Sequence, residues 1–143
     1  MSAELIDNYF RAVNTENWPL MADLWNETGE LVAVGVTPRV GRERILEYFP
    51  RILAGYAEHV DTPSRIVAAG DTVLVEIDFV GRLRSGSPIA FNAVDVFDLV
   101  DGRIQRLATW YDSQSVFKMV AEAGGTRSAA PGPAAIRSAE KVN

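Results

Sequence analysis

The sequence predicts an α+β fold in which three N-terminal helices pack on a strongly curved, mostly antiparallel sheet, followed by a short C-terminal helix. Two observations support this prediction. Apolar residues recur at helical spacing up to Gly55, and apolar and polar residues alternate at strand spacing from Ser64 onward. A length of 143 residues with 48% hydrophobic residues suffices for one core, which we place in residues 1–123.

Helical spacing defines the first half of the chain. The predicted elements are a helix from Ser2 to Val13, a helix from Trp18 to about Gly29, a strand from Leu31 to Val36 and a helix that begins at Arg42. The last of these helices contains Pro50, which should kink or split it because proline lacks a backbone donor and clashes with the preceding turn.

Alternation defines the second half. The predicted strands are Ser64–Ala69, Thr72–Leu83, Ile89–Val100 and Arg103–Tyr111, joined as an antiparallel meander. Asp101-Gly102 favours a two-residue hairpin turn, since both residues tolerate positive φ angles. Asp112 or Ser113 can cap a final short helix. Residues 124–143 form a low-complexity segment rich in Gly, Ala and Pro, and we expect a disordered tail there.

Composition excludes several classes of function. The net charge of −5, from 14 basic and 19 acidic residues, argues against nucleic acid or a membrane surface as a partner. Cysteine is absent and His59 is the only histidine, which excludes disulfides and zinc sites built on several His or Cys ligands. We expect no cofactor, although a metal site made of carboxylates alone stays open. No apolar run is long enough to span a bilayer, so a cytoplasmic location is expected.

Asp95 is the residue on which the functional prediction depends. It interrupts an apolar strand and shares its face with Phe91, Ala93 and Phe97. A carboxylate in that setting costs stability unless it is hydrogen-bonded or neutral. The pattern therefore predicts that Asp95 lines a pocket.

The turn at Ser85-Gly86 determines which other carboxylates join Asp95. A loop of two or four residues places Glu76 opposite Asp95 and Asp78 opposite Ala93, whereas a three-residue loop separates them. Carboxyl groups gathered in an apolar cavity have raised pKa values, so one stays a neutral donor while another can act as a base. In the alternative interpretation, Glu76 and Asp78 lie on an ordinary solvent face.

Other residues also have a structural alternative. His59 can be a loop or strand-entry residue instead of a base, and Tyr9 can be a core residue with a locally bonded hydroxyl. The long strands are apolar on both faces. One face should therefore cover the helices and the other a second copy of the chain, which predicts a homodimer through the sheet.

Several stretches resemble the nuclear-transport-factor-2-like superfamily, which includes SnoaL-like polyketide cyclases, ketosteroid isomerases and limonene epoxide hydrolases. The resemblance covers residues 3 to about 120 and is carried by Tyr9–Asn14, Leu24-Trp25, Pro38–Gly41 with the following helix, Ala93–Ile104 and Trp110–Asp112. It implies a cone-shaped α+β barrel. It does not identify the reaction, because the fold hosts isomerases, hydrolases, dehydratases, cyclases and binding proteins.

The resemblance to ketosteroid isomerase implies that Tyr9 takes the place of the oxyanion-hole tyrosine and Asp95 that of the protonated aspartic acid. The general base of that family would fall near Ala33, and alanine cannot accept a proton. The candidates for a replacement base are Asp78, Glu76 and His59.

The resemblance to limonene epoxide hydrolase implies an acid–arginine–acid arrangement at Asp78, Glu76 and Thr109, and only Asp78 matches. SnoaL-like cyclases, which use a carboxylic acid in a shaped apolar pocket, tolerate these departures best.

The sequence thus predicts a cofactor-independent acid–base enzyme, an isomerase, cyclase or dehydratase, whose substrate is a hydrophobic carbonyl compound such as a polyketide or steroid-like molecule. Asp95 and Tyr9 would bond the developing oxyanion, and Asp78 or His59 would move the proton. The expected substrate-binding residues are Trp25, Tyr48, Phe49, Glu76, Ala93, Phe97, Leu107, Thr109 and Tyr111. The alternatives are an epoxide hydrolase and a non-catalytic ligand-binding or dimerisation domain.

Overall fold

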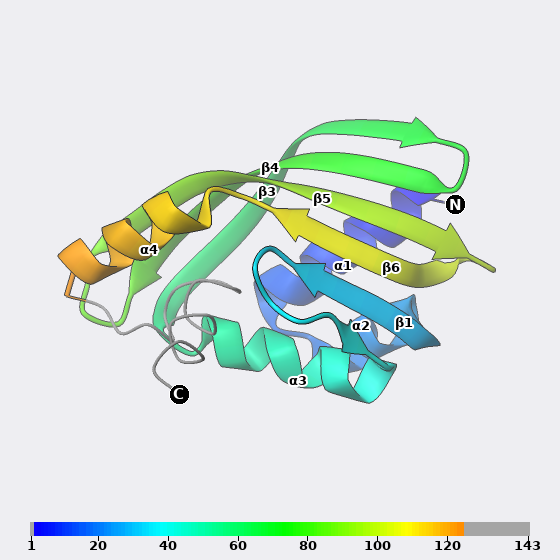
Figure 1. Ribbon diagram of the computed structural model, residues 1–143, viewed down its shortest axis with the longest axis horizontal. Coiled ribbons are helices and arrows are strands. Elements are labelled where there is room, and N and C mark those ends of the chain that lie inside the picture. The colour runs from blue at the N-terminus through cyan, green and yellow to red at the C-terminus, as the bar shows by residue number, and fades with distance from the viewer. Residues whose placement is uncertain (1, 125–143) are drawn as a thin grey trace.

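Four helices lie against a six-stranded sheet in the part of the chain that the computed structural model describes, residues 2–124 (Figure 1). The helices are α1 (Ser2–Thr15), α2 (Trp18–Leu24), α3 (Arg42–Leu53) and α4 (Ser113–Glu122). The strands are β1 (Trp25–Ala33), β2 (Arg39–Val40), β3 (Tyr56–Ala69), β4 (Thr72–Leu83), β5 (Pro88–Val100) and β6 (Arg103–Trp110). Apart from Gly124, the predicted disordered tail lies outside the described residues.

The strand order is β2-β1-β6-β5-β4-β3, and every neighbouring pair is antiparallel except β1 with β6. The predicted α+β fold with a mostly antiparallel sheet is therefore confirmed. The sheet does not close into a barrel, because β2 and β3 each have a free edge among the described residues. As Figure 1 shows, α1 and α3 pack on the same side of the curved sheet. The C-terminal helix α4 lies at the end of the sheet where β4 turns into β5.

The second helix is shorter than predicted. Asn17 caps it by accepting a hydrogen bond from the Leu20 N–H at 3.1 Å, and it ends at Leu24 instead of near Gly29. Trp25 begins β1, where it is buried opposite Ile104 of β6. Pairing with β6 outweighs helix propensity in a segment that contains Asn, Thr and Gly, all poor helix formers.

Pro50 does not split α3, which continues from Arg42 to Leu53. Proline removes one backbone hydrogen bond from the Leu46 carbonyl, a group one turn earlier in the helix. Pro50 itself is exposed, so water can reach this side of the helix. The prediction that Pro50 splits the helix is therefore wrong.

The first long strand begins eight residues earlier than predicted. β3 starts at Tyr56, contains Pro63 and carries an irregularity between Pro63 and Arg65. Proline is tolerated there because β3 is an edge strand, where one side of the backbone has no neighbouring strand to bond. The longer strand brings Asp61 into the sheet opposite Phe79.

The register of β4 and β5 is the one that a three-residue loop gives. Leu83 N–H donates to the Ser87 carbonyl at 2.9 Å, which closes a three-residue loop in which Gly86 has φ +100°. Val75 therefore lies opposite Asp95, and Asp78 opposite Asn92. Because side chains alternate between faces, this one-residue difference puts the carboxylates of β4 on the face opposite Asp95.

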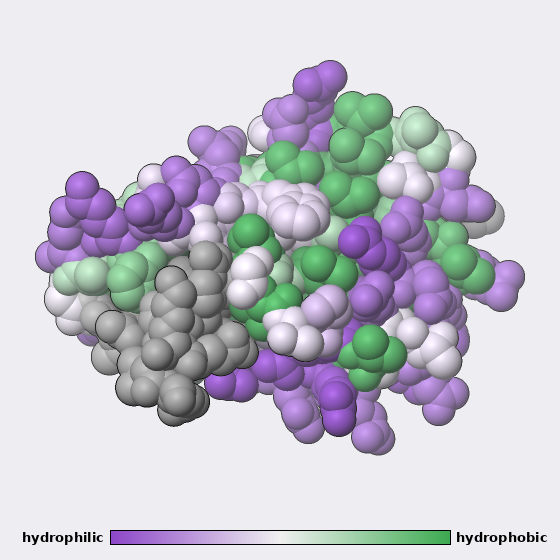
Figure 2. Space-filling view, viewed as in Figure 1, coloured by the Kyte–Doolittle hydropathy of each residue, from purple (hydrophilic) through white to green (hydrophobic). Residues whose placement is uncertain are grey.

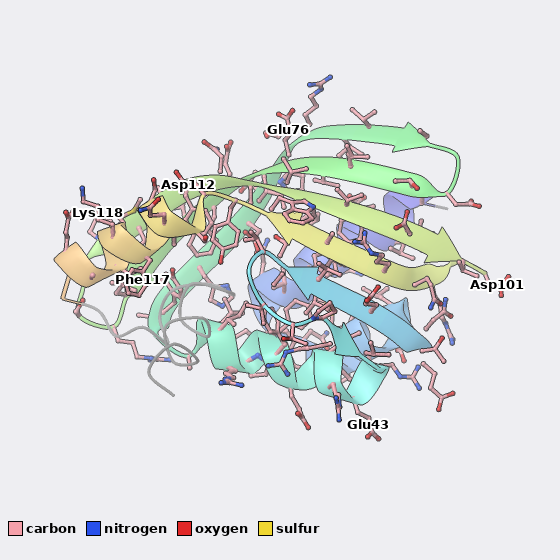
Figure 3. All side chains as sticks on the ribbon, in the orientation of Figure 1. Glu43, Glu76, Asp101, Asp112, Phe117 and Lys118 are labelled. Atoms are coloured by element: carbon pink, nitrogen blue, oxygen red, sulfur yellow. The ribbon has the colours of Figure 1, made fainter. Side chains whose placement is uncertain are left out.

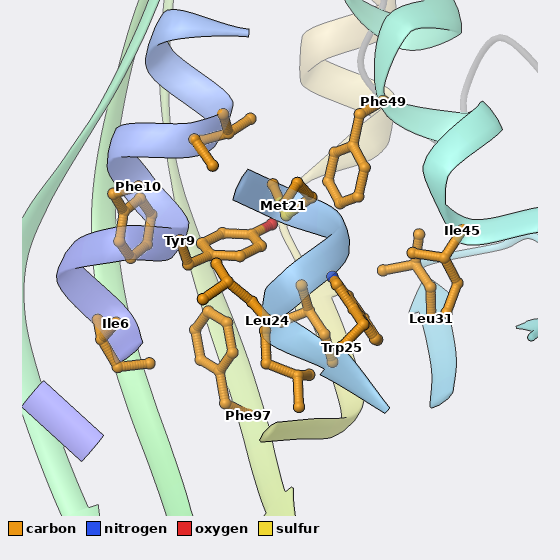
Figure 4. Close-up of a cluster of buried hydrophobic side chains, with 14 of the residues drawn as sticks. Ile6, Tyr9, Phe10, Met21, Leu24, Trp25, Leu31, Ile45, Phe49 and Phe97 are labelled. Atoms are coloured by element: carbon orange, nitrogen blue, oxygen red, sulfur yellow. The ribbon is translucent and has the colours of Figure 1, made fainter. Parts of the chain in front are cut away.

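Aromatic and aliphatic side chains fill the space between the helices and the inner face of the sheet (Figure 4). Tyr9 extends from α1 into the middle of this cluster, with ring centroids 5.0 Å from Phe97 and 6.2 Å from Phe49. Both contacts are edge-on, the geometry that aromatic pairs favour. No helix among residues 2–124 is long and apolar enough to cross a membrane.

Gly81 allows two aromatic rings to pack against β4 at the narrow end of the sheet. A Cβ atom at this position would lie 2.9 Å from Tyr56 Cδ1 and 3.0 Å from the Phe79 ring. We expect Gly81→Ala to lower the free energy of unfolding by about 1–3 kcal/mol in urea denaturation, because both rings must shift. Val40→Ala removes an exposed side chain from β2 and serves as the control. Equal stability of the two variants would contradict this packing.

Candidate functional site

A cavity of about 80 Å³ lies between α1, α3 and the inner face of the sheet. Its walls are mostly aromatic and aliphatic, and the acidic residues that line it are Asp61 from β3 and Asp95 from β5. A cavity of this size holds a few water molecules or a small organic group, and it is smaller than the pockets that take drug-sized ligands. The site is thus an apolar pocket with two carboxyl groups.

Asp95 is one of two buried polar or charged residues among residues 2–124. Burial and then charge on Asp61 raise its pKa to about 7, and a hydrogen bond from the Thr109 side chain opposes the shift. Thr109 is placed for this bond because it lies opposite Asp95 in the β5–β6 register. The prediction that Asp95 faces a pocket agrees with this geometry.

Asp61 is the residue that sequence reasoning missed. Burial raises its pKa to about 6, and charge on His59 lowers it. The two backbone polar groups of Asp61 bond to the side chain of Asn14, with the Asn14 Nδ2 donating to the carbonyl at 2.9 Å and the Asp61 N–H donating to Oδ1 at 2.8 Å. The Asn14 amide thus takes the place of a neighbouring strand and ties the edge of the sheet to α1.

Two tyrosines complete the polar part of the wall. Burial raises the pKa of Tyr9 well above its ordinary value, and charge on Asp95 and then on Asp61 raises it further. Tyr48 is also buried, which raises its pKa, although Arg39 lies over its ring at 5.3 Å and opposes the shift. Both phenols are therefore neutral at physiological pH and can donate hydrogen bonds.

The pocket contains eight of the residues predicted for the site. They are Tyr9, Tyr48, Phe49, Ala93, Asp95, Leu107, Thr109 and Tyr111. Residues that the prediction did not include also line it: Val13, Leu31, Ile52, Leu53, Asp61, Ile77, Phe79 and Phe91. Most of the second group are aliphatic or aromatic residues that the sequence presents as ordinary core.

Glu76 and Asp78 lie outside this pocket. Both are exposed on the outer face of β4, where Glu76 forms an ion pair with Arg65 at 3.2 Å and Asp78 accepts a hydrogen bond from Asn92. Figure 3 shows Glu76 projecting from the sheet on the side away from α3. The predicted cluster with Asp95 is wrong because the β4–β5 loop has three residues, and the solvent-face alternative holds.

Three further predicted residues do not line the pocket either. Trp25 and Phe97 are fully buried in the core, so they support the wall instead of contacting a ligand. His59 is in β3, buried, and bonded through Nε2 to Glu16 Oε2 at 3.0 Å. It is therefore a strand residue, not a loop residue, and it lies beside Asp61 without reaching the cavity.

Asp61 escaped prediction because Pro63 and the charged residues before it obscure the strand. The usable signal was the pair of β-branched neighbours, Val60 and Thr62, which favour strand on both sides of the carboxylate. No group of three or more His, Cys, Asp or Glu side chains among residues 2–124 is arranged to hold a metal ion.

Comparison with known proteins agrees with this architecture. A family model described as a SnoaL-like domain matches residues 6–107. The chain belongs to the SnoaL-like family. None of the curated proteins matches the sequence significantly.

Solved structures of SnoaL-like and related proteins share the fold at low sequence identity. A protein from Catenulispora acidiphila DSM 44928 with a ketosteroid isomerase-like fold, solved with trimethylamine, has 21% identity and a TM-score of 0.73 over 80% of this chain and 90% of its own. A candidate polyketide cyclase from Xanthomonas campestris pv. campestris has 20% identity and a TM-score of 0.75 over 85% and 95%. An epoxide hydrolase of the limonene epoxide hydrolase type from M. tuberculosis has 21% identity and a TM-score of 0.71 over 84% and 89%.

These likenesses establish a nuclear-transport-factor-2-like fold for this SnoaL-like domain and leave its reaction to be decided by the site itself.

The raised pKa values predict an unusual dependence of stability on pH. Between about pH 4 and pH 7 the folded protein keeps protons on Asp61 and Asp95 that the unfolded chain has lost, so their contribution to the free energy of unfolding falls as pH rises. Asp95→Asn removes one of these groups and can still accept a hydrogen bond from Thr109. In urea denaturation, the free energy of unfolding of the variant minus that of the wild type should increase by up to about 1.4 kcal/mol for each pH unit across this window. A difference that does not change with pH would contradict the burial of Asp95.

Proposed function

We propose that this SnoaL-like protein is a cofactor-independent acid–base enzyme that moves a proton at the carbon next to a carbonyl group. The observation that carries the proposal is the pair of desolvated carboxyl groups, Asp61 and Asp95, that face one apolar pocket together with Tyr9. Like charges in a desolvated site do not both ionise readily, so one member can be the base and the other the acid near neutral pH.

In the proposed reaction, the ionised carboxylate removes a proton from the α-carbon. The electron pair of the C–H bond forms the carbon–carbon double bond of the enolate, and the π pair of the carbonyl group moves to its oxygen. Asp95 in its neutral form and the Tyr9 hydroxyl then donate hydrogen bonds to the developing oxyanion. The protonated base returns the proton to another carbon in an isomerisation, or assists the loss of a leaving group in a dehydration. Asp61 takes the base role that was expected of Asp78 or His59.

The substrate we propose is compact and apolar. The cavity of about 80 Å³ suits a compound of about one ring better than a steroid-sized one, and its aliphatic and aromatic walls match an apolar body. One carbonyl oxygen of the substrate would accept the hydrogen bonds that neutral Asp95 and Tyr9 donate in the pocket.

Proton exchange measures this activity without knowledge of the true substrate. We expect the wild type to accelerate deuterium incorporation into the α-position of small cyclic enones and 1,3-diketones in D2O, followed by proton NMR. Asp61→Asn and Asp95→Asn should each lower the rate by about two to three orders of magnitude, the usual cost of losing one group that acts in the transition state.

Asp78→Asn is the matched control, since it removes a carboxylate from the outer face of β4 and should leave the exchange rate unchanged. Loss of exchange in Asp78→Asn with retention in Asp61→Asn would reject the proposed site. Failure of every compound in the panel to exchange would favour the non-catalytic binding domain.

Epoxide hydrolysis is the second candidate, supported by the likeness to the M. tuberculosis protein. The acid–arginine–acid positions of that type do not come together here: Thr109 lines the pocket, whereas Asp78 and Glu76 face outward. Adding cyclohexene oxide to the same panel and detecting the diol would test it.

We also propose that two copies of the chain associate through the outer face of the sheet. Apolar side chains are exposed there on four adjacent strands, and Figure 2 shows hydrophobic groups over the upper strands. They include Val60, Leu74, Val80 and Trp110, which are 39–58% exposed. These apolar side chains flank Glu76 and Asp78 on the same face, so the proposed interface combines apolar and charged groups, as interfaces between separate chains commonly do.

Trp110→Asp should convert the protein from dimer to monomer in light scattering after size exclusion, because it places a charge in the centre of the proposed interface. Val40→Asp changes an equally exposed apolar residue on β2 and should leave the mass unchanged. A monomer mass for the wild type at micromolar concentration would overturn the proposal.

A further inference from the structure

His59 and Glu16 form a partly buried pair beside the proposed base, and the proposed reaction does not use them. The side chain of His59 is 5% exposed and that of Glu16 is 54% exposed, so the pair runs from the interior of the protein to its surface. His59 Nε2 lies 3.0 Å from Glu16 Oε2. A carboxylate at this distance fixes the orientation of the ring and makes Nε2 the protonated nitrogen.

The other ring nitrogen, Nδ1, is buried and has no hydrogen-bond partner among the described residues. A buried polar atom without a partner is rare in folded proteins and calls for an explanation. Protonation at Nδ1 makes the ring a cation whose charge is only partly offset by Glu16, which is half in water. A ring that carries both protons places its positive charge on the inner face of β3.

Asp61 is the carboxyl group that interacts electrostatically with that charge. His59 and Asp61 lie two residues apart on the same face of β3, and the opposite residue of β4 at His59 is Gly81, which contributes no side chain. Asn14 holds the backbone of Asp61 while the same end of α1 leads to Glu16. Charge on His59 lowers the pKa of Asp61, whereas the pKa of Asp95 is shifted by burial, by charge on Asp61 and by the hydrogen bond from Thr109.

The other titratable groups near the pair do not supply a competing charge. Tyr56 is buried on the same strand, and burial followed by charge on Asp61 raises its pKa, so its phenol stays neutral. Glu58 and Arg82 form an ion pair at 3.5 Å on the exposed outer face.

The backbone at Glu16 indicates that its side chain has a role. Glu16 follows the end of α1 and has φ +54°, a left-handed conformation that glycine or asparagine adopts more easily at this position. Backbone strain at a non-glycine residue persists where the surrounding structure determines it. The carboxylate that reaches His59 accounts for a glutamate at such a position.

We propose that His59, oriented by Glu16, is a positioning residue that makes Asp61 the ionised member of the carboxyl pair and leaves Asp95 as the neutral hydrogen-bond donor. The catalytic meaning of this inference rests on the proposed function, but the charge assignment itself does not. It determines the direction of proton transfer in the pocket: the β3 wall accepts the proton, and the β5 wall bonds the oxyanion.

Carbon-detected NMR titration of the aspartate carboxyl groups tests the assignment, with Asp61→Asn and Asp95→Asn used to identify the signals. In the wild type, Asp61 should titrate at lower pH than Asp95. In His59→Gln, the midpoint of Asp61 should rise by about one pH unit, the effect expected for losing a nearby opposite charge. Glu16→Gln keeps the fold and the shape of the pair, and should shift Asp61 in the same direction by a smaller amount.

Glu58→Gln is the matched control, because it neutralises an adjacent glutamate on the opposite face of β3 and should leave both midpoints in place. His59→Lys restores a positive charge without an imidazole and should return Asp61 toward its wild-type midpoint, a rescue that a merely structural role would not give. Asp95 titrating before Asp61 in the wild type, or an unmoved Asp61 in both His59→Gln and Glu16→Gln, would overturn the inference.

The titration and the exchange assay test the two proposals independently. A correct order of midpoints without any proton exchange would reject the proposed enzyme and keep the charge assignment. Exchange that depends on Asp61 with no response of its midpoint to His59 would keep the enzyme and reject the role of the pair.

Discussion

The pairing of β4 with β5 is the constraint on which the rest of the site depends. Side chains alternate along both strands, so the length of the loop between them decides which set of residues faces the helices. With Arg84, Ser85 and Gly86 in the loop, Asp95 is covered by α1 while the carboxylates of β4 remain in water. A loop one residue shorter or longer would put Glu76 and Asp78 on the same face as Asp95, and three acidic groups from these two strands would then compete for one apolar space. The observed register leaves one acid of this strand pair, Asp95, on the inner face, and Asp61 of β3 is the second acid of the pocket.

Most of the framework could be predicted from the sequence, because its signals are strong and local. The apolar stripe of α1, the alternation in β4 and β5 and the positive φ angles at Asp101-Gly102 each determine one element almost independently of the others. The pocket role of Asp95 followed from the same alternation. The predictions that failed, the end of α2 and the start of β3, depended on contacts between residues distant in sequence. Trp25 lies in a strand because it pairs with β6, and Pro63 is tolerated in β3 because β3 is an edge strand. The loop after β4 was ambiguous because Gly86 fits loops of two, three or four residues.

Burying Asp61 and Asp95 lowers stability near neutral pH, and the fold contains compensating contacts on each side of the pocket. Thr109 bonds Asp95 from the neighbouring strand, and Asn14 fixes the backbone of Asp61 from a helix. The apolar cluster around Tyr9 supplies the favourable burial that offsets the cost of the carboxyl groups. A site of this kind keeps water away from a base and thereby strengthens every charge interaction within it. The same desolvation that weakens the fold thus makes the carboxyl pair chemically useful.

Placing the base on β3 instead of β1 also changes the geometry of the reaction that the pocket can support. Ala33 of β1 lies opposite Thr109 in the β1–β6 register, on the same part of the wall as Asp95. A base at that position would share one side of the cavity with the oxyanion donor. Asp61 belongs to the edge strand at the far side of β4, so in the proposed reaction a carbonyl compound would lie between base and donor with its α-carbon toward β3. The departure at Ala33 is therefore compatible with acid–base chemistry, provided that the proton is taken from the face of the substrate that β3 covers.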